Sequence, residues 1–178
     1  MVAAALGRPA SGTRIVCLDG PAGAGKTTMA AAVVAAAPGD VALLHMDDVY
    51  EGWSGLAAGM EVVARDVVGP LLEGRPGRYR RWDWYAMAYA EEHEVSPGDL
   101  LVVEGVGSGN VVYADATTLL VWVDGPPDVR LERGVARDGE GLRAQWAGWT
   151  AQEETVFAAH RTRQRADLVV DGVSGRVC

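Results

Sequence analysis

The sequence predicts an α/β fold in three layers, in which a parallel sheet of about five strands is flanked by helices and carries a small lid. Strand-like apolar runs alternate along the chain with helix-like segments, a pattern typical of parallel sheets covered on both faces. A glycine-rich turn joins the first strand-like run to the first helix-like segment. Two later apolar runs end in an acidic residue, which places these acids at the sheet edge where ligands of such folds bind.

The predicted strands are short runs that are β-branched or continuously apolar. The first, residues 13–19, reads TRIVCLD and stops at the glycine-rich turn. The others are residues 41–46, 100–104, 118–124 and 166–170.

The predicted helices follow alanine-rich stretches without a breaker, or apolar residues at helical spacing. Residues 26–37 end at a Pro-Gly pair, and residues 56–72 end before a glycine and a proline. Residues 127–137 and 143–160 are the remaining two. The segment 75–95 is less regular and rich in aromatic residues, so we expect it to be an inserted substrate-binding region.

Length and composition favour one domain over residues 13–178, preceded by a flexible tail over residues 1–12. The 178 residues are 49% hydrophobic and 22% charged, which is typical of a globular chain with its own core. A net charge of −8 argues against duplex DNA binding, which needs a strongly basic face. We expect no membrane span or secretory signal, and the two cysteines form no disulfide framework, so the expected location is cytoplasmic. Many small domains of this kind dimerise, so a homodimer stays open, although nothing in the sequence marks an interface.

Residues 20–27 read GPAGAGKT and match the phosphate-binding pattern G-x-x-x-x-G-K-[ST] in full. Its glycines let backbone N–H groups surround phosphate oxygens, and the following helix adds the positive end of its dipole. We expect Lys26 to reach the β- and γ-phosphates of ATP and the Thr27 hydroxyl to ligate Mg²⁺. The predicted nucleotide-binding residues are Gly20, Pro21, Ala22, Gly23, Ala24, Gly25, Lys26, Thr27 and Thr28.

Lys26 is the only lysine of the chain, since all other basic residues among the sixteen are arginines. A lysine kept in so arginine-rich a sequence indicates a position where a planar guanidinium cannot replace a compact ammonium.

Acidic residues follow two of the predicted strands. Asp47 and Asp48 come directly after residues 41–46, where a carboxylate can accept the proton of an attacking hydroxyl. Asp47 is the first choice for this base and Asp48 the second, and the alternative is that both cap the following turn. Glu104 ends another strand and is the predicted partner of Thr27 in holding Mg²⁺.

Arginines and aromatic residues are the remaining candidates. Arg133 and Arg137 lie on one face of a predicted helix and can neutralise transferring phosphates, while a lid over residues 137–146 closes. The expected substrate contacts are Asp48, Tyr50, Arg81, Trp82, Asp83 and Tyr85. The arginines near position 80 favour an alternative acceptor that already carries a phosphate, and they are Arg75, Arg78, Arg80 and Arg81.

With these motifs the chain resembles the uridine kinase-like branch of the P-loop kinases, which includes relatives of phosphoribulokinase and pantothenate kinase. The similarity spans roughly residues 13–170 and rests on GPAGAGKTT, MDDVY, WDWY, VVEG, VDGPPDVRLERGVARD and ADLVV in the family order. The resemblance implies that Asp47 is the catalytic base and that Glu104 assists Mg²⁺. It also implies that Trp82 and Asp83 open a nucleoside-binding segment and that Arg137 contacts phosphates.

The chain departs from this family in its lid and in its substrate segment. Gly134 stands where uridine kinases usually have a second arginine, and DGEGLRAQWAGW replaces their arginine-rich lid. The tyrosine and histidine that read a pyrimidine have no clear counterparts in YAMAYAEEHEV.

The sequence therefore predicts a kinase that uses Mg²⁺ and ATP to phosphorylate a hydroxyl of a small molecule, with a nucleoside or a nucleoside-like metabolite as the leading acceptor. One alternative is a kinase for a phosphorylated acceptor, such as a nucleoside monophosphate. Another is a regulatory nucleotide-binding module without catalysis. A GTPase is disfavoured, because the guanine-reading motif N-K-x-D needs a second lysine.

Overall fold

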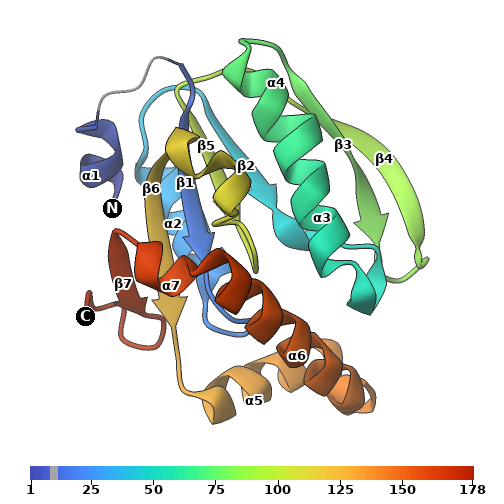
Figure 1. Ribbon diagram of the computed structural model, residues 1–178. Helices are drawn as coiled ribbons and strands as arrows, with labels where there is room; N and C mark the ends of the chain where they lie inside the picture. Colours follow the sequence, from blue (N-terminus) through green and yellow to red (C-terminus); the bar gives the residue numbers. More distant parts are fainter. Residues whose placement is uncertain (9–11) are drawn as a thin grey trace.

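The computed structural model describes residues 1–8 and 12–178 (Figure 1). Its centre is a five-stranded sheet in the order β2-β5-β1-β6-β7, and all neighbouring strands pair in parallel. The strands are β1 (Arg14–Asp19), β2 (Val41–His45), β5 (Leu100–Glu104), β6 (Thr117–Asp124) and β7 (Leu168–Asp171). The predicted α/β fold with its parallel sheet is thus confirmed.

Helices cover both faces of this sheet (Figure 1). They are α1 (Val2–Leu6), α2 (Lys26–Ala36), α3 (Leu56–Val62), α4 (Gly69–Leu72), α5 (Pro127–Asp138), α6 (Arg143–His160) and α7 (Thr162–Arg165). A stretch of wider π-helical turns, Val63–Val68, joins α3 to α4, so that the predicted helix 56–72 is continuous. Short 3₁₀ turns occupy Met46–Asp48, Gly52–Ser54, Val111–Ala116 and Glu140–Leu142.

Successive residues of β1 serve two separate halves of the core. Ile15 and Cys17 pack into the cluster that also holds side chains of α3 and α6. Val16 and Leu18 pack on the opposite face, in the cluster that contains Val33 of α2. Because side chains alternate along a strand and both faces are covered, every residue of β1 after Arg14 is buried.

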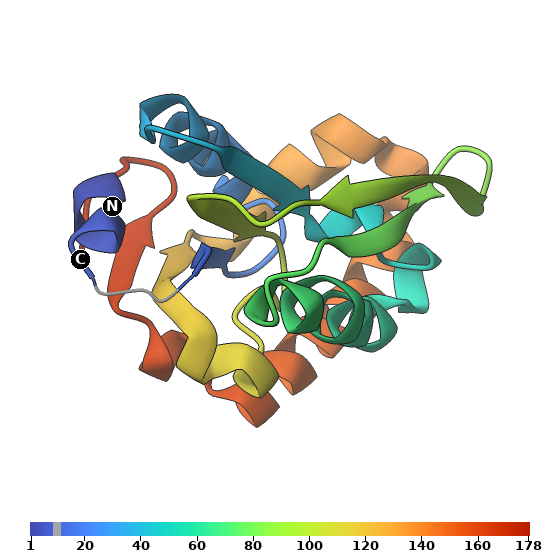
Figure 2. The ribbon, with the colours of Figure 1, turned by 90° about the horizontal axis from the view of Figure 1, so that it is seen from above.

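The segment predicted to be irregular is a two-stranded antiparallel hairpin of β3 (Gly77–Asp83) and β4 (Ala88–Val95). Figure 2 shows its tip reaching out from the body of the molecule. Tyr79 and Trp82 face inward and are buried, whereas Arg78 and Arg80 on either side of Tyr79 are exposed. The outer face of the hairpin is highly charged, and Arg78 pairs with Glu94 across it at 2.7 Å. These charged residues made the alternation of a strand difficult to recognise in the sequence.

Residues near both ends of the chain contact the body of the domain. Within the expected tail 1–12, residues Val2–Leu6 form a helix, and Ala5 is buried. Arg8 donates hydrogen bonds to the carbonyl of Thr118 at 2.7 Å and to Asp167 at 2.8 Å. Residues 9–11 lie outside the described part. At the other end, Val177 forms an antiparallel bridge with Val170.

Within the described residues, no helix has a run both long and apolar enough to cross a membrane.

Asp19, the last residue of β1, ties together the loops at the carboxyl edge of the sheet. Its completely buried carboxylate accepts hydrogen bonds from the backbone N–H groups of Gly20, Gly107 and Gly109 at 2.7–2.9 Å. Burial raises the pKa of Asp19 from 3.8 to about 6, although these three bonds and the nearby Lys26 oppose the shift.

This buried acid predicts a distinct pH dependence of stability. Between pH 3.8 and about 6 the folded protein keeps a proton on Asp19 that the unfolded chain releases, so stability falls as the pH rises through this window. The difference corresponds to roughly 3 kcal/mol. In urea unfolding from pH 4 to 7, Asp19→Asn is expected to lack this fall, so that its stability relative to the wild type improves with pH. Parallel pH profiles of the two proteins would show that Asp19 does not titrate in this way.

Candidate active site

The phosphate-binding loop connects β1 to α2 and opens onto a cleft of about 580 Å³. Gly23 and Gly25 have φ angles of 76° and 100°, a region that other residues rarely adopt, and Gly25 is the N-cap of α2. The loop therefore presents its backbone and the N-terminus of an 11-residue helix to the cleft, as an anion-binding site requires. Six of the nine predicted nucleotide-binding residues line the cleft, namely Ala22, Gly23, Gly25, Lys26, Thr27 and Thr28; Gly20, Pro21 and Ala24 belong to the loop without lining it.

Lys26 lies folded back on its own loop. Its side chain is buried, and Nζ donates a hydrogen bond to the Pro21 carbonyl at 2.8 Å. Burial lowers the pKa of Lys26, and nearby carboxylates, Glu153 first among them, act in the opposite direction. A phosphate in the cleft would offer this ammonium a stronger partner than a neutral carbonyl.

Thr27 and Glu104 meet at the predicted Mg²⁺ position. The Thr27 hydroxyl donates to Glu104 Oε1 at 3.1 Å, and His45 Nδ1 lies 2.6 Å from the same oxygen. His45 and Glu104 are paired in register at the carboxyl ends of β2 and β5, and this contact raises the pKa of His45. The hydroxyl and carboxylate oxygens fit Mg²⁺, which prefers such ligands together with substrate phosphates.

His45 has no role in the sequence-based prediction, because it reads as an ordinary strand residue. Its contact with Glu104 depends on the strand order, since β5 lies between β2 and β1. The order of the strands cannot be read from the sequence of β2 alone.

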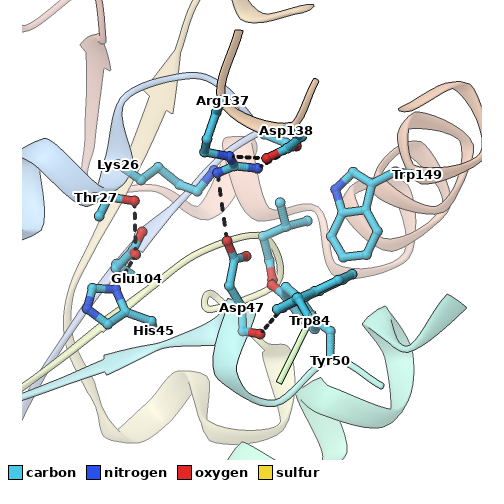
Figure 3. A network of polar contacts seen from close by, with 12 residues as sticks. Lys26, Thr27, His45, Asp47, Tyr50, Trp84, Glu104, Arg137, Asp138 and Trp149 are labelled. Carbon is cyan, nitrogen blue, oxygen red and sulfur yellow. Dashed lines mark hydrogen bonds and ion pairs between the residues drawn. The ribbon is translucent and has the colours of Figure 1, made fainter. Parts of the chain in front are cut away.

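Asp47 lies in the cleft, in the 3₁₀ turn that follows β2 (Figure 3). Its carboxylate is 58% exposed and points toward Arg137, with 3.9 Å between Oδ2 and Nη1. Partial desolvation in the cleft raises the pKa of Asp47, and Arg137 counteracts this effect. Asp48 does not line the cleft, so the geometry favours Asp47 over Asp48 as the base.

The two arginines predicted to act on phosphates both line the cleft from α5. Arg133 donates to the carbonyl of Gly23 in the phosphate loop at 3.3 Å. Arg137 is held by Asp138 at 2.6 Å, which leaves its guanidinium between that acid and Asp47 (Figure 3). The expected lid, residues 137–146, covers the end of α5, the 3₁₀ turn and the start of α6.

The predicted substrate residues divide into two groups. Tyr50 and Tyr85 line the cleft, whereas Asp48, Arg81, Trp82 and Asp83 do not. Asp83 instead accepts hydrogen bonds from the backbone N–H groups of Tyr85 and Ala86, both at 2.9 Å, and so stabilises the hairpin turn. Arg81 pairs with Glu91 of β4 at 2.6 Å.

Glu153 of α6 is a site residue that the sequence analysis missed. It is buried, and its Oε1 accepts a hydrogen bond from the backbone N–H of Ala22 in the phosphate loop at 2.7 Å. Trp149, one turn earlier, donates its indole N–H to the same oxygen at 2.8 Å. Burial raises the pKa of Glu153. This acid connects α6 to the loop, and only its place on the buried face of a helix hints at such a role in the sequence.

The structure gives a reason for the glycine at position 134. The Trp146 ring of α6 packs against the backbone of α5 so closely that a β-carbon on Gly134 would overlap with it. Two of the departures from the uridine kinase pattern, the glycine at position 134 and the tryptophan at position 146 of the altered lid, thus form a single contact that joins α5 to α6.

Gly134→Ala is therefore expected to destabilise the protein by about 1–3 kcal/mol, because the methyl group overpacks this contact. Gly148→Ala is the matched control: Gly148 also lies within a helix, but its β-carbon would meet no atom within 4 Å. Alanine there is expected to stabilise by about 0.5–1 kcal/mol, as in an ordinary helix. Thermal unfolding of both variants tests this, and an equal gain in the two would contradict the packing of Trp146 on Gly134.

No family model matches the chain, and no curated protein matches its sequence. Solved structures do match. A structure described as that of a possible uridine kinase from Bacillus stearothermophilus superposes with a TM-score of 0.67 at 18% identity, over 92% of this chain and 91% of the other. A candidate fructose transport system kinase from Silicibacter sp. TM1040 gives a TM-score of 0.63 at 18% identity, over 90% of each chain. These similarities show that the chain shares the three-layer α/β fold of these two structures.

Proposed function

We propose that the protein is a phosphotransferase that uses ATP and Mg²⁺ to phosphorylate a hydroxyl group of a small molecule. The observation that carries this proposal is that the phosphate loop, Asp47 and the arginines of α5 all line one cleft. A triphosphate held by the loop would lie with its γ-phosphate toward Asp47 and Arg137, where an acceptor can approach.

In the proposed reaction, Lys26 leaves the Pro21 carbonyl and binds the β- and γ-phosphates together with the loop N–H groups. Thr27 and Glu104 would hold Mg²⁺, with His45 orienting the Glu104 carboxylate. When bound, this ion neutralises phosphate charge. Arg133 and Arg137 add positive charge from the lid side, where charge develops during transfer.

Asp47 would accept the proton of the acceptor hydroxyl. The hydroxyl oxygen forms a bond to the γ-phosphorus, the bond from that phosphorus to the bridging oxygen breaks, and ADP leaves. Because Arg137 lies near the Asp47 carboxylate, it can also keep this base ionised in a partly desolvated cleft.

A neutral acceptor is better supported than a phosphorylated one. Of the arginines that favoured a phosphorylated acceptor, three lie on the hairpin and Arg75 lies just before it, and none of them lines the cleft. Three have carboxylate partners, and the fourth, Arg80, donates to the carbonyls of Tyr89 and Ala90. The paired ones are Arg75 with Glu73, Arg78 with Glu94 and Arg81 with Glu91.

The test is the release of ADP from Mg²⁺-ATP, with and without panels of neutral alcohols, nucleosides and phosphorylated alcohols, with Lys26→Ala as the blank. The proposal expects that neutral alcohols stimulate ADP release and that the blank abolishes the stimulation. ATP binding without stimulation by any acceptor would favour the regulatory nucleotide-binding module, and stimulation by phosphorylated compounds alone would favour the phosphorylated-acceptor alternative.

A further inference from the structure

The part of the cleft beyond the phosphate loop has walls made of aromatic rings. Four of the six tryptophans of the chain contribute, and the aromatic lining residues are Tyr50, Trp53, Trp84, Tyr85, Trp146 and Trp149. They come from segments far apart in the sequence: the turns after β2, the hairpin tip and α6. We call this set the aromatic wall.

Trp53 lies at the centre of the aromatic wall. Its ring centroid is 5.6 Å from that of Trp84, 6.1 Å from that of Trp149 and 6.3 Å from that of Trp146. All three contacts are edge-to-face, and Trp53 itself is only partly buried. Because Trp53 is partly exposed and lines the cleft, part of its ring surface is available to a further flat ring.

The polar atoms of three residues of the aromatic wall have partners in the protein, whereas the buried indole N–H of Trp146 has none among the described residues. The indole N–H of Trp84 donates to the Asp47 carbonyl at 2.9 Å, and the Tyr50 hydroxyl donates to the Val106 carbonyl at 2.6 Å. The indole N–H of Trp149 is taken by Glu153. Trp84, Tyr50 and Trp149 therefore offer a ligand their ring surfaces rather than hydrogen bonds. Figure 3 shows Trp84 and Tyr50 beside Asp47 in this part of the cleft.

The acid of the hairpin that the sequence suggested for binding a sugar is engaged elsewhere. Asp83, which could accept hydrogen bonds from sugar hydroxyls, binds the backbone of its own turn and does not line the cleft. The backbone carbonyl of Asp47 accepts a hydrogen bond from Trp84, which places Asp47 beside the aromatic wall. A ligand ring held by the aromatic wall can place one hydroxyl at Asp47, whereas hydroxyls that lie against the ring surfaces would lose their water without finding partners, which opposes binding.

We propose that the acceptor is an uncharged alcohol whose body is a flat aromatic or heteroaromatic ring, that the aromatic wall binds this ring, and that Trp53 is the main determinant of this specificity. The inference rests on the proposed kinase function and adds the substrate class. One hydroxyl of the ring alcohol lies at Asp47. Its oxygen takes the γ-phosphoryl group of ATP, its proton passes to Asp47, and ADP is the leaving group.

The first experiment compares acceptors of known shape. Tryptophol and 2-phenylethanol are the ring alcohols, 2-cyclohexylethanol is their non-aromatic match, and glycerol, ribose and glycerol 3-phosphate represent polar acceptors. We expect kcat/KM for the two ring alcohols to exceed that for each polar acceptor by about tenfold or more, with cyclohexylethanol in between. A polyol or a phosphorylated compound that is preferred over both ring alcohols would overturn the inference.

A second comparison separates recognition of a ring from recognition of a sugar. Uridine and 2′,3′-dideoxyuridine share a base and a 5′-hydroxyl but differ in two sugar hydroxyls. A site that reads the ring should bind both within about threefold, as measured by calorimetry with the protein loaded with a non-hydrolysable ATP analogue. Tighter binding of uridine by tenfold or more would mean that the site contacts the sugar and would contradict the inference.

Variants of Trp53 test the residue directly. Trp53→Ala is expected to raise KM for the ring alcohols by about tenfold or more, while the affinity for the ATP analogue stays within about twofold; Trp53→Phe should restore most of the loss. Trp122→Phe is the matched control, because this buried tryptophan packs against Phe157 outside the cleft and should leave KM unchanged. Equal effects of Trp53→Ala and Trp122→Phe would contradict the role of Trp53.

Binding and turnover together distinguish the two proposals. Binding of ring alcohols in calorimetry, with no phosphorylation of any acceptor tested, would contradict the kinase function and leave the aromatic wall as their binding site. Transfer to other acceptors without binding of ring alcohols would support the kinase function and overturn the substrate class.

Discussion

Lys26→Ala is expected to lower kcat by roughly 10²-fold or more, because it removes a preorganised positive charge from the position of the β- and γ-phosphates. Lys26 is the single lysine of the chain, its side chain is buried in the cleft, and its only hydrogen bond within the described residues goes to the Pro21 carbonyl. The partner it has without nucleotide is therefore weak, and the charge is available to a phosphate. Steady-state ADP release at saturating ATP measures the effect.

Lys26→Arg tests whether this position needs an ammonium group or only a positive charge. If the position needs a compact ammonium, arginine will not restore activity although it keeps the charge. Arg176→Ala, a change at an exposed basic residue near the C-terminus, is the control and should leave kcat within about twofold. Activity of Lys26→Ala within a few-fold of the wild type would contradict the assignment of Lys26 as the residue that binds the β- and γ-phosphates.

Asp47→Asn is expected to lower kcat by about 10²–10⁴-fold with little change in ATP affinity, because an amide cannot accept the proton of the acceptor. The raised pKa of Asp47 adds a pH signature: the base must be ionised, so kcat/KM of the wild type should fall on acidification at a higher pH than for an ordinary aspartate. The residual activity of Asp47→Asn should lack this acidic limb. Both are measured as pH profiles of product formation.

The neighbouring residue provides the control for this variant. Asp48→Asn changes the same chemical group one residue along the chain and outside the cleft, so it is expected to stay within a few-fold of the wild type. A large loss in Asp48→Asn together with an active Asp47→Asn would reverse the choice of base.

The parts of the site that were predictable from the sequence are those that depend on local order. The phosphate loop follows a strand and begins a helix, so its residues and their geometry are specified within a few positions. Asp47 and Glu104 were found because carboxyl ends of parallel strands share one edge of the sheet. Arg133 and Arg137 were found because their spacing places them on one helical face.

Contacts between distant segments were not predictable in this way. Glu153 binds the backbone of Ala22, 131 positions away, and His45 reaches Glu104 across 59 positions. In the sequence, Gly134 only marks the absence of an arginine that uridine kinases usually have. The structure shows that Trp146 packs on this glycine. Such pairs depend on how helices and strands are placed relative to one another, and a single sequence carries no periodicity that reports this.

The hairpin shows a second limit of prediction from the sequence, which concerns the role of polar residues. Its aromatic residues and arginines suggested a substrate site, and Tyr85 does line the cleft together with the neighbouring Trp84. The arginines and Asp83, however, stabilise the hairpin itself through ion pairs and a turn. Polar residues that pair across a hairpin and polar residues that bind a ligand have the same composition, so only the structure separates them.

The central claim is that the cleft transfers the γ-phosphate of ATP to an alcohol, and ³¹P NMR of a reaction mixture tests it most directly. With Mg²⁺-ATP and tryptophol or 2-phenylethanol, we expect a new phosphomonoester resonance that grows in step with ADP and is absent with Lys26→Ala and Asp47→Asn. If the panel of neutral alcohols, nucleosides and phosphorylated alcohols yields only inorganic phosphate, or no change in ATP at all, the account of the protein as a phosphotransferase is contradicted.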